Sequence, residues 1–244
     1  MSGSWVRARR WAEDKVFPPV CVLCRVGGLA GSLCEDCLAT LPRVREPFCR
    51  VCGEHFEGAF SGAFSCSNCR ERQFSFAFAR APFLAEGRVR TWIHEFKFDR
   101  RFHRRGLLAD LLVRVWERPE IAALRADAPL VVPVPLHWRR RWRRGFDQAA
   151  ELAYGFARRS GLRWAKALRR VRATETQSAL PREVRLQNMR KAFALRPSQR
   201  EKLRGATVLL VDDVFTTGAT VQACAEVLLA AGVRKCVVIT LARG

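Results

Sequence analysis

The sequence has no apolar run long enough to cross a membrane, and its first residues lack the hydrophobic segment of a secretory signal. We therefore expect a soluble, cytoplasmic protein without a membrane span. Acidic residues are scarce: 23 Asp and Glu stand against 44 Lys and Arg, which gives a formal charge of +21. This excess favours anionic partners such as nucleic acid or a polyphosphate. With 244 residues and 49% apolar content, the chain can form one sizeable core and a small extra module.

Cysteine is concentrated in four CxxC pairs near the start of the chain. Each pair can supply two thiolates to a tetrahedral zinc ion, so the eight sulfurs fit two four-cysteine sites. The simplest assignment is sequential, with one site of Cys21, Cys24, Cys34 and Cys37 and another of Cys49, Cys52, Cys66 and Cys69. Spacing alone also permits crossed pairing. Disulfides are the alternative to zinc, and the lack of a signal segment favours zinc. Cys224 and Cys236 lie in apolar patterns, which indicate core positions.

Residues 208–220, VLLVDDVFTTGAT, combine a strand, a loop and the start of a helix. The apolar first part is typical of a parallel strand buried on both faces, and it ends in Asp212 and Asp213. Gly218 permits a tight turn, and apolar residues at helical spacing predict a helix over 219–231. An ordinary buried strand followed by a threonine cap is the alternative interpretation. Two consecutive carboxylates at a strand end argue against it, because such charges are unfavourable there unless they bind something.

This segment suits a ribose 5-phosphate. A phosphate at the helix start would meet unpaired N–H groups and threonine hydroxyls, while the carboxylates suit a ribose diol or a magnesium ion shared with it. The segment resembles the signature loop of type I phosphoribosyltransferases, which bind phosphoribosyl pyrophosphate (PRPP). The resemblance implies a PRPP site with Mg²⁺ that comprises Asp212, Asp213, Thr216, Thr217, Gly218, Ala219 and Thr220. Purine-salvage members have an Asp where this chain has Thr216, so a purine-base transferase is disfavoured.

Arginines and tryptophans alternate in 137–153, HWRRRWRRGFDQAAELA, between a predicted strand at 130–135 and a predicted helix at 147–159. By position this loop resembles the pyrophosphate loop of the transferases, with Arg144 as a PRPP contact. Alternating aromatic and guanidinium groups also suit single-stranded DNA. The DNA-binding candidates are Arg139, Arg140, Arg141, Arg143, Trp138 and Trp142. A solvated basic turn is the alternative.

A further basic stretch, 169–191, has no sustained apolar stripe and lies between predicted strands at 162–168 and 192–195. In the transferases the corresponding insertion is a mobile loop that closes over substrate and excludes water. A solvated helix and loop is the competing interpretation. The resemblance implies that the catalytic candidates are Asp212 and Asp213, together with Arg182 and Arg185 from this stretch.

The motifs FPPVCVLC, EFKFDRR, VVPVPLHWRRRWRRGFDQA and VLLVDDVFTTGAT occur in an order similar to that of the ComF family of competence and DNA-utilisation proteins. Asp147 departs from the Asn usual in that family. The resemblance implies an α/β fold of the type I phosphoribosyltransferase kind, Rossmann-like, with a mostly parallel sheet flanked by helices. We expect this domain over 73–244, behind an N-terminal helix and a double zinc ribbon over 1–72.

Three elements are expected in the first part of the larger domain. Alternation over 74–85 predicts a strand, and helices are predicted at 87–98 and 105–116. Lys97, on the first of these helices, either contacts an anion or extends its charge into solvent.

Two functions fit these features. The first is a protein of natural transformation and DNA uptake that binds PRPP and single-stranded DNA; family membership implies a competence helicase or recombination mediator as partner. The alternative is an active phosphoribosyltransferase that acts on a nucleobase or other small acceptor and has no DNA role. The sequence does not specify the acceptor.

Overall fold

The computed structural model describes residues 20–27, 32–58, 64–98, 104–137, 142, 145–172 and 191–244. The chain divides into two compact units, Met1–Leu41 and Pro42–Gly244. In the smaller unit, the short helix α2 (Glu35–Ala39) begins directly after Cys34. Within the described part of the chain, no helix is both long and apolar enough to cross a membrane.

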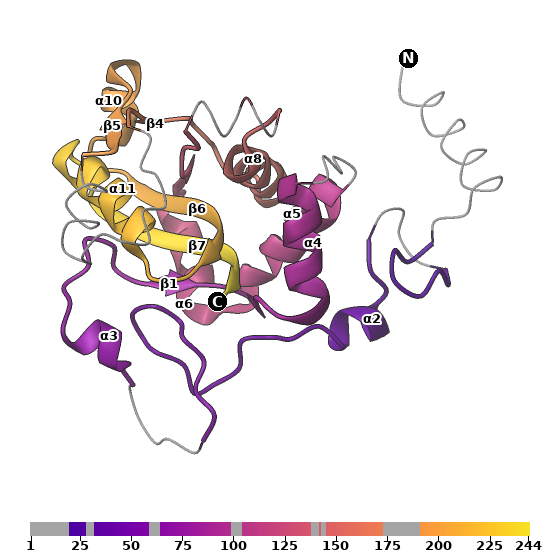
Figure 1. Cartoon of the computed structure of the whole chain (residues 1–244). Helices are drawn as coiled ribbons and strands as arrows, with labels where there is room; N and C mark the ends of the chain where they lie inside the picture. The colour runs from indigo at the N-terminus through magenta and orange to yellow at the C-terminus, as the bar shows by residue number, and fades with distance from the viewer. Residues whose placement is uncertain are drawn as a thin grey trace, which may run out of the picture. The chain divides into compact units, whose positions relative to one another are not determined.

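A parallel sheet forms the centre of the larger unit (Figure 1). Its strand order is β1-β7-β6-β3, and β2 also pairs with β7. The strands are β1 (Ala79–Arg80), β2 (Phe83–Leu84), β3 (Leu130–Pro133), β6 (Thr207–Phe215) and β7 (Lys235–Arg243). The apolar runs of β3, β6 and β7 are buried along almost their whole length, as expected for strands covered on both faces.

Helices cover both faces of this sheet (Figure 1). On one face α5 (Arg104–Val113) packs on α8 (Gln148–Ser160), α8 contacts β3 and β6, and α4 (Gly87–Phe98) packs on α5. On the other, α11 (Ala219–Ala230) contacts β6 and β7. The remaining short helices are α3 (Ser67–Arg70), η1 (Arg114–Glu117), α6 (Pro119–Ala122), η2 (Ala123–Asp127), η3 (Pro197–Gln199) and α10 (Arg200–Leu203). The predicted α/β fold with a mostly parallel sheet is confirmed.

Two predicted strands differ from the structure. The predicted strand at 74–85 is only β1 and β2, because Pro82 has no N–H to continue a ladder and the segment bends between them. The strand predicted at 162–168 is reduced to one isolated parallel bridge between Trp164 and Val131 of β3. The strand β4 (Leu168–Arg170) begins at the last residue of the predicted range and pairs antiparallel with β5 (Phe193–Leu195). These two strands flank residues 173–190, which lie outside the described residues.

Candidate functional site

The acidic pair lies within the last part of β6, before the strand ends at Phe215. Both carboxylates are half-buried. Asp213 Oδ2 forms an ion pair with Lys97 Nζ at 2.9 Å. The backbone N–H of Asp213 donates a hydrogen bond to Asp212 Oδ1 at 2.9 Å. Lys97 comes from the end of α4, so a helix remote in sequence supplies the counter-charge. Of the two alternatives for Lys97, the structure supports an anion contact, and the anion is the carboxylate of Asp213 in the motif itself.

The two carboxylates differ in their surroundings. Burial, and next the neighbouring Asp213 carboxylate, raise the pKa of Asp212 to about 8, while Lys97 opposes this and Asp147 adds to it. Asp212 therefore retains its proton at neutral pH when no ligand is present. Binding of a cation or of a hydroxyl-bearing ligand that needs the ionised form must displace that proton.

The loop after β6 has the geometry of an anion site. Gly218 adopts φ 77°, a left-handed conformation that side-chain-bearing residues adopt only with strain. A Cβ there would lie 2.8 Å from the Phe215 ring. Gly218 is the N-cap of α11 and provides no side-chain cap, so the first N–H groups of this helix of twelve residues are open to a ligand. The Thr216 and Thr217 side chains are exposed beside them.

A cavity of about 170 Å³ joins the acidic pair to the segment after β3. Asp147 lies on its wall, where Oδ1 caps α8 by accepting from Ala150 N–H at 3.1 Å. The carboxylate that replaces the usual Asn thus keeps the capping role and adds negative charge to the cavity. The lining residues are Lys97, Val134, Pro135, Leu136, Asp147, Gln148, Ala149, Arg170, Asp212, Asp213 and Thr220.

The sequence analysis missed Arg170 and Gln148 as residues of this cavity. Arg170 is the last residue of β4, at the start of the basic stretch, and brings a cation to the rim. Gln148 is buried on the first turn of α8. Gln148 belongs to the motif VVPVPLHWRRRWRRGFDQA and Arg170 to the basic stretch 169–191, but only the general rule that ligands bind beyond strand ends could have indicated that they line this cavity.

Part of the predicted site lies outside the described residues. This holds for the PRPP candidate Arg144, the catalytic candidates Arg182 and Arg185, and the DNA-binding candidates Trp138, Arg139, Arg140, Arg141 and Arg143. Trp142 is described, and its side chain is 85% exposed. A tryptophan this exposed is available for stacking.

The cysteines form the two predicted clusters. Each cluster brings four sulfurs within 4.8 Å of one another, and the pairing is sequential: Cys21, Cys24, Cys34 and Cys37, then Cys49, Cys52, Cys66 and Cys69. Backbone amides point at the sulfurs, as thiolate ligands require: Cys34 N–H donates to Cys21 Sγ at 3.4 Å, and Cys66 N–H to Cys49 Sγ at 3.3 Å. The donor set and its spacing fit a tetrahedral zinc ion in each cluster. Cys224 and Cys236 are buried in the core, as predicted.

The two clusters belong to different compact units. The first lies in Met1–Leu41, whereas the second lies in Pro42–Gly244 and is part of the same hydrophobic core as β3, β6 and α11. All four of its cysteines are buried, whereas Cys24 of the first cluster is exposed. The second site is thus built into the larger unit.

Two family models match parts of this chain. Residues 12–72 match the double zinc ribbon domain, and residues 143–244 match the phosphoribosyl transferase domain. DNA utilization protein YhgH of Salmonella typhimurium is 33% identical over 88% of this chain and 92% of its own length. Competence protein F of Haemophilus influenzae is 32% identical over 91% of this chain and 96% of its own.

Among solved structures, the allosteric regulatory enzyme of purine biosynthesis is similar over 55% of this chain and 25% of its own, with 23% identity and a TM-score of 0.37. This partial overlap does not bear on ligands.

Proposed function

The chain belongs to the ComF family of competence and DNA-utilisation proteins, and on that premise we propose that it binds PRPP with Mg²⁺ and holds single-stranded DNA during DNA uptake. The observation that carries the proposal is one cavity edge where two carboxylates, Lys97 and an uncapped helix start converge. We place this activity in the cytoplasm, with a competence helicase or recombination mediator as partner.

On this proposal the 5-phosphate lies against the N–H groups of α11 and the hydroxyls of Thr216, Thr217 and Thr220. Asp212 and Asp213 hold the ribose hydroxyls, or a Mg²⁺ ion shared with them, and Mg²⁺ would neutralise the diphosphate charge. Because Asp212 keeps a proton in the free protein, PRPP and Mg²⁺ should bind with release of close to one proton near neutral pH.

Single-stranded DNA would bind the loop of alternating arginine and tryptophan. The exposed Trp142 ring offers a stacking platform, and the surrounding guanidinium groups neutralise backbone phosphates. The formal charge of +21 favours such binding over the whole chain, so the local role of the loop must be tested separately.

Calorimetric titration with PRPP and Mg²⁺ tests the first half of the proposal. Asp213→Ala should abolish PRPP binding and leave DNA binding intact. The same titration in two buffers of different ionisation enthalpy measures the released proton. Retention of PRPP affinity in Asp213→Ala would show that the ligand lies elsewhere.

Salt-dependent binding of a single-stranded oligonucleotide tests the second half. Arg140→Glu with Arg143→Glu should weaken binding and flatten the slope of log affinity against log salt by about 1 for each phosphate that is no longer neutralised. Arg158→Glu with Arg163→Glu is the matched control, since it makes the same charge change at two exposed positions elsewhere. Equal loss of affinity in both pairs would indicate attraction by net charge alone.

A small-acceptor transferase remains the second candidate. A cavity of about 270 Å³ beside Thr216 and Thr217, with aromatic walls from Phe74 and Phe215, is the observation that favours it. Release of pyrophosphate from PRPP that depends on an added nucleobase, with no change on addition of DNA, would favour this candidate.

A further inference from the structure

We propose that the second four-cysteine site and the phosphate loop are coupled through Arg243, so that zinc in this site holds the loop in its binding conformation. Arg243 is then a positioning residue rather than a ligand of PRPP. The consequence for affinity rests on the proposed function of the loop. The structural coupling does not depend on it.

The second site is fixed to the edge of the sheet. In the knuckle between Cys49 and Cys52, Val51 O accepts from Ala79 N–H of β1 at 2.7 Å. Gly53 lies so close to β1 that a Cβ would meet Ala79 O at 2.9 Å. This cluster therefore cannot rearrange without moving an edge of the parallel sheet.

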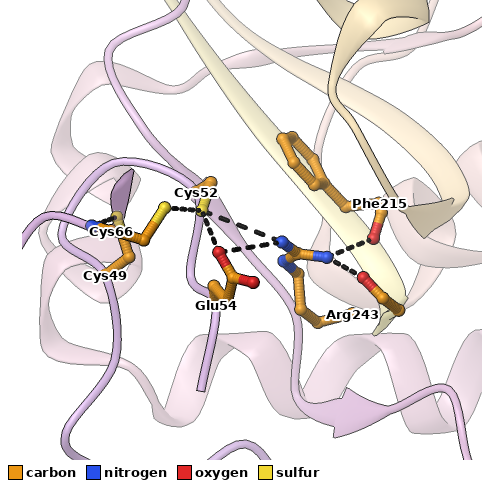
Figure 2. Close-up of polar contacts among 7 residues, drawn as sticks. Cys49, Cys52, Glu54, Cys66, Phe215 and Arg243 are labelled. Atoms are coloured by element: carbon orange, nitrogen blue, oxygen red, sulfur yellow. Dashed lines mark hydrogen bonds and ion pairs between the residues drawn. The ribbon is translucent and has the colours of Figure 1, made fainter. Parts of the chain in front are cut away.

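Arg243, near the carboxyl end of β7, connects the cluster to β6 (Figure 2). Its Nη2 lies 3.9 Å from Cys52 Sγ and 3.5 Å from a Glu54 carboxylate oxygen. Its Nη1 donates to Phe215 O at 3.1 Å, directly before the phosphate loop. One planar guanidinium thus touches both a zinc-site sulfur and the backbone that begins the loop.

Charge explains why the metal matters to this contact. The Arg243 side chain is 8% exposed, and a guanidinium so deeply buried is costly unless anions surround it. A zinc ion with four thiolates carries a net charge of −2, which adds to the charge of Glu54 beside Arg243. Without zinc, nothing ties Cys52 Sγ to the other three sulfurs, and its contact with Arg243 Nη2 at 3.9 Å is no longer held in place. Zinc loading therefore stabilises the inward position of Arg243.

Aromatic side chains also connect the phosphate loop to the segment that follows the second four-cysteine site. The Phe76 ring contacts Phe74 and Phe215, with ring centroids 4.7 Å and 6.0 Å away. Phe215 and Phe74 in turn lie under Gly218, at 2.8 Å and 3.4 Å from the position of a Cβ. Displacement of Phe215 must therefore move the turn that presents the first N–H groups of α11.

A shared cavity shows how close the two sites are. The cavity of about 270 Å³ is lined from one side by Cys52, Glu54, Asn68, Cys69 and Arg72, and from the other by Phe74, Phe215, Thr216, Thr217, Arg243 and Gly244. Because coupling between two sites is reciprocal, a ligand on the loop should also raise the affinity of the second site for zinc.

Three full-length variants test the proposal, with zinc release to a colorimetric chelator and hydrogen exchange at 215–220 as readouts. Arg243→Gln should speed the loss of one zinc ion by about 10- to 100-fold, the usual effect of removing an outer-shell partner. It should also raise exchange in the loop. Arg243→Lys keeps the positive charge but loses the planar guanidinium that contacts two partners at once. Compared with Arg243→Gln, zinc retention should be largely restored, while hydrogen exchange in the loop should stay high.

Cys24→Ser with Cys37→Ser is the matched control, because it removes the first site from the other compact unit. It should lose one zinc ion and leave exchange at 215–220 unchanged. Chelation of the remaining zinc in this background should then raise loop exchange, which tests the coupling without any change to Arg243.

Two results would overturn the proposal: an Arg243→Gln protein that releases both zinc ions at the wild-type rate, or a loop whose exchange is unaltered after the second zinc is removed. Titration with PRPP distinguishes a failure of the coupling from a failure of the proposed function. If loop exchange responds to zinc but the wild-type protein does not bind PRPP, the coupling holds and the proposed function fails.

Discussion

Replacement of Asp212 by Asn should stabilise the ligand-free protein at alkaline pH. Burial, followed by the Asp213 charge, raises the pKa of Asp212 from 3.8 to about 8. The folded state therefore binds this proton more tightly than the unfolded state. The stability gained from the neutral form is fully present below about pH 4 and is lost as pH rises through about 8. Asn mimics the neutral form at every pH, and its oxygen can still accept the Asp213 N–H.

The magnitude follows from the difference between the two pKa values. At about 1.4 kcal/mol for each tenfold change in proton affinity, the upper bound is about 6 kcal/mol. The Asp212 side chain is only half-buried, so solvent screening reduces this, and we expect about 2 kcal/mol. Urea unfolding of zinc-loaded wild type and Asp212→Asn should give a difference in stability of about this size near pH 9, and the difference should become smaller as pH falls toward 6.

Asp127→Asn is the control of opposite sign. Asp127 is exposed and accepts from Thr207 Oγ1 at 2.9 Å, and this hydrogen bond, with Arg234 nearby, lowers its pKa. Its carboxylate therefore stabilises the fold above pH 4, and the substitution should destabilise there. A gap for Asp212→Asn that stays constant with pH, or a wild type that is the more stable protein near pH 9, would refute the reasoning.

Three further substitutions, the first with a control variant, test the packing of α8 on α5, the loop after β6 and the charge of the site. Gly155→Ala should lower the free energy of unfolding by about 1–3 kcal/mol, measured by thermal unfolding, because the new Cβ would lie 2.6 Å from Ala109 Cβ and push α8 away from α5. The control is Gly106→Ala, which should not destabilise the protein, because its Cβ would meet only the Arg159 side chain at 3.9 Å. Gly218→Ala should weaken PRPP binding about 10-fold in calorimetry, since strain at φ 77° costs about 1–2 kcal/mol; unchanged affinity would contradict the loop assignment. Lys97→Met removes the cation that lowers the pKa of Asp212, so Asp212 should hold its proton more tightly at pH 7 and PRPP affinity should fall there. The affinity should recover by pH 9, where Asp212 ionises. A loss of affinity that is the same at both pH values would contradict this explanation.

The sequence predicted features that depend on local pattern. The buried strand before Asp212, the turn at Gly218 and the helix after it all follow from residue type over a few positions. The cysteine pairing was predicted as the simplest of several options, and only the positions of the sulfurs excluded crossed pairing. The strand predicted over 74–85 was too long, because alternation of apolar residues cannot show that only β1 and β2 reach the sheet edge.

Contacts between segments that are far apart in the chain could not be predicted from the sequence. Lys97 and Asp213 lie on different elements, and nothing in either motif indicates that the lysine is the counter-ion of the acidic pair. Arg243 was not singled out, since an arginine near the end of an apolar strand has no distinctive spacing. Its role follows from β7 lying beside β6, which places its guanidinium next to Phe215 O and Cys52 Sγ.

The charges of the acidic pair show how the free protein tolerates two adjacent carboxylates within a parallel strand. One is neutralised by a retained proton on Asp212 and the other by Lys97 at 2.9 Å. Both neutralising groups can leave, because a proton dissociates to solvent and a lysine side chain rotates on a flexible stem. A fixed arginine fork in place of Lys97 would hold the pair more rigidly and compete with any cation for the same oxygens. The combination therefore stabilises the empty site at low cost while leaving both carboxylates available to a sugar diol or a metal ion.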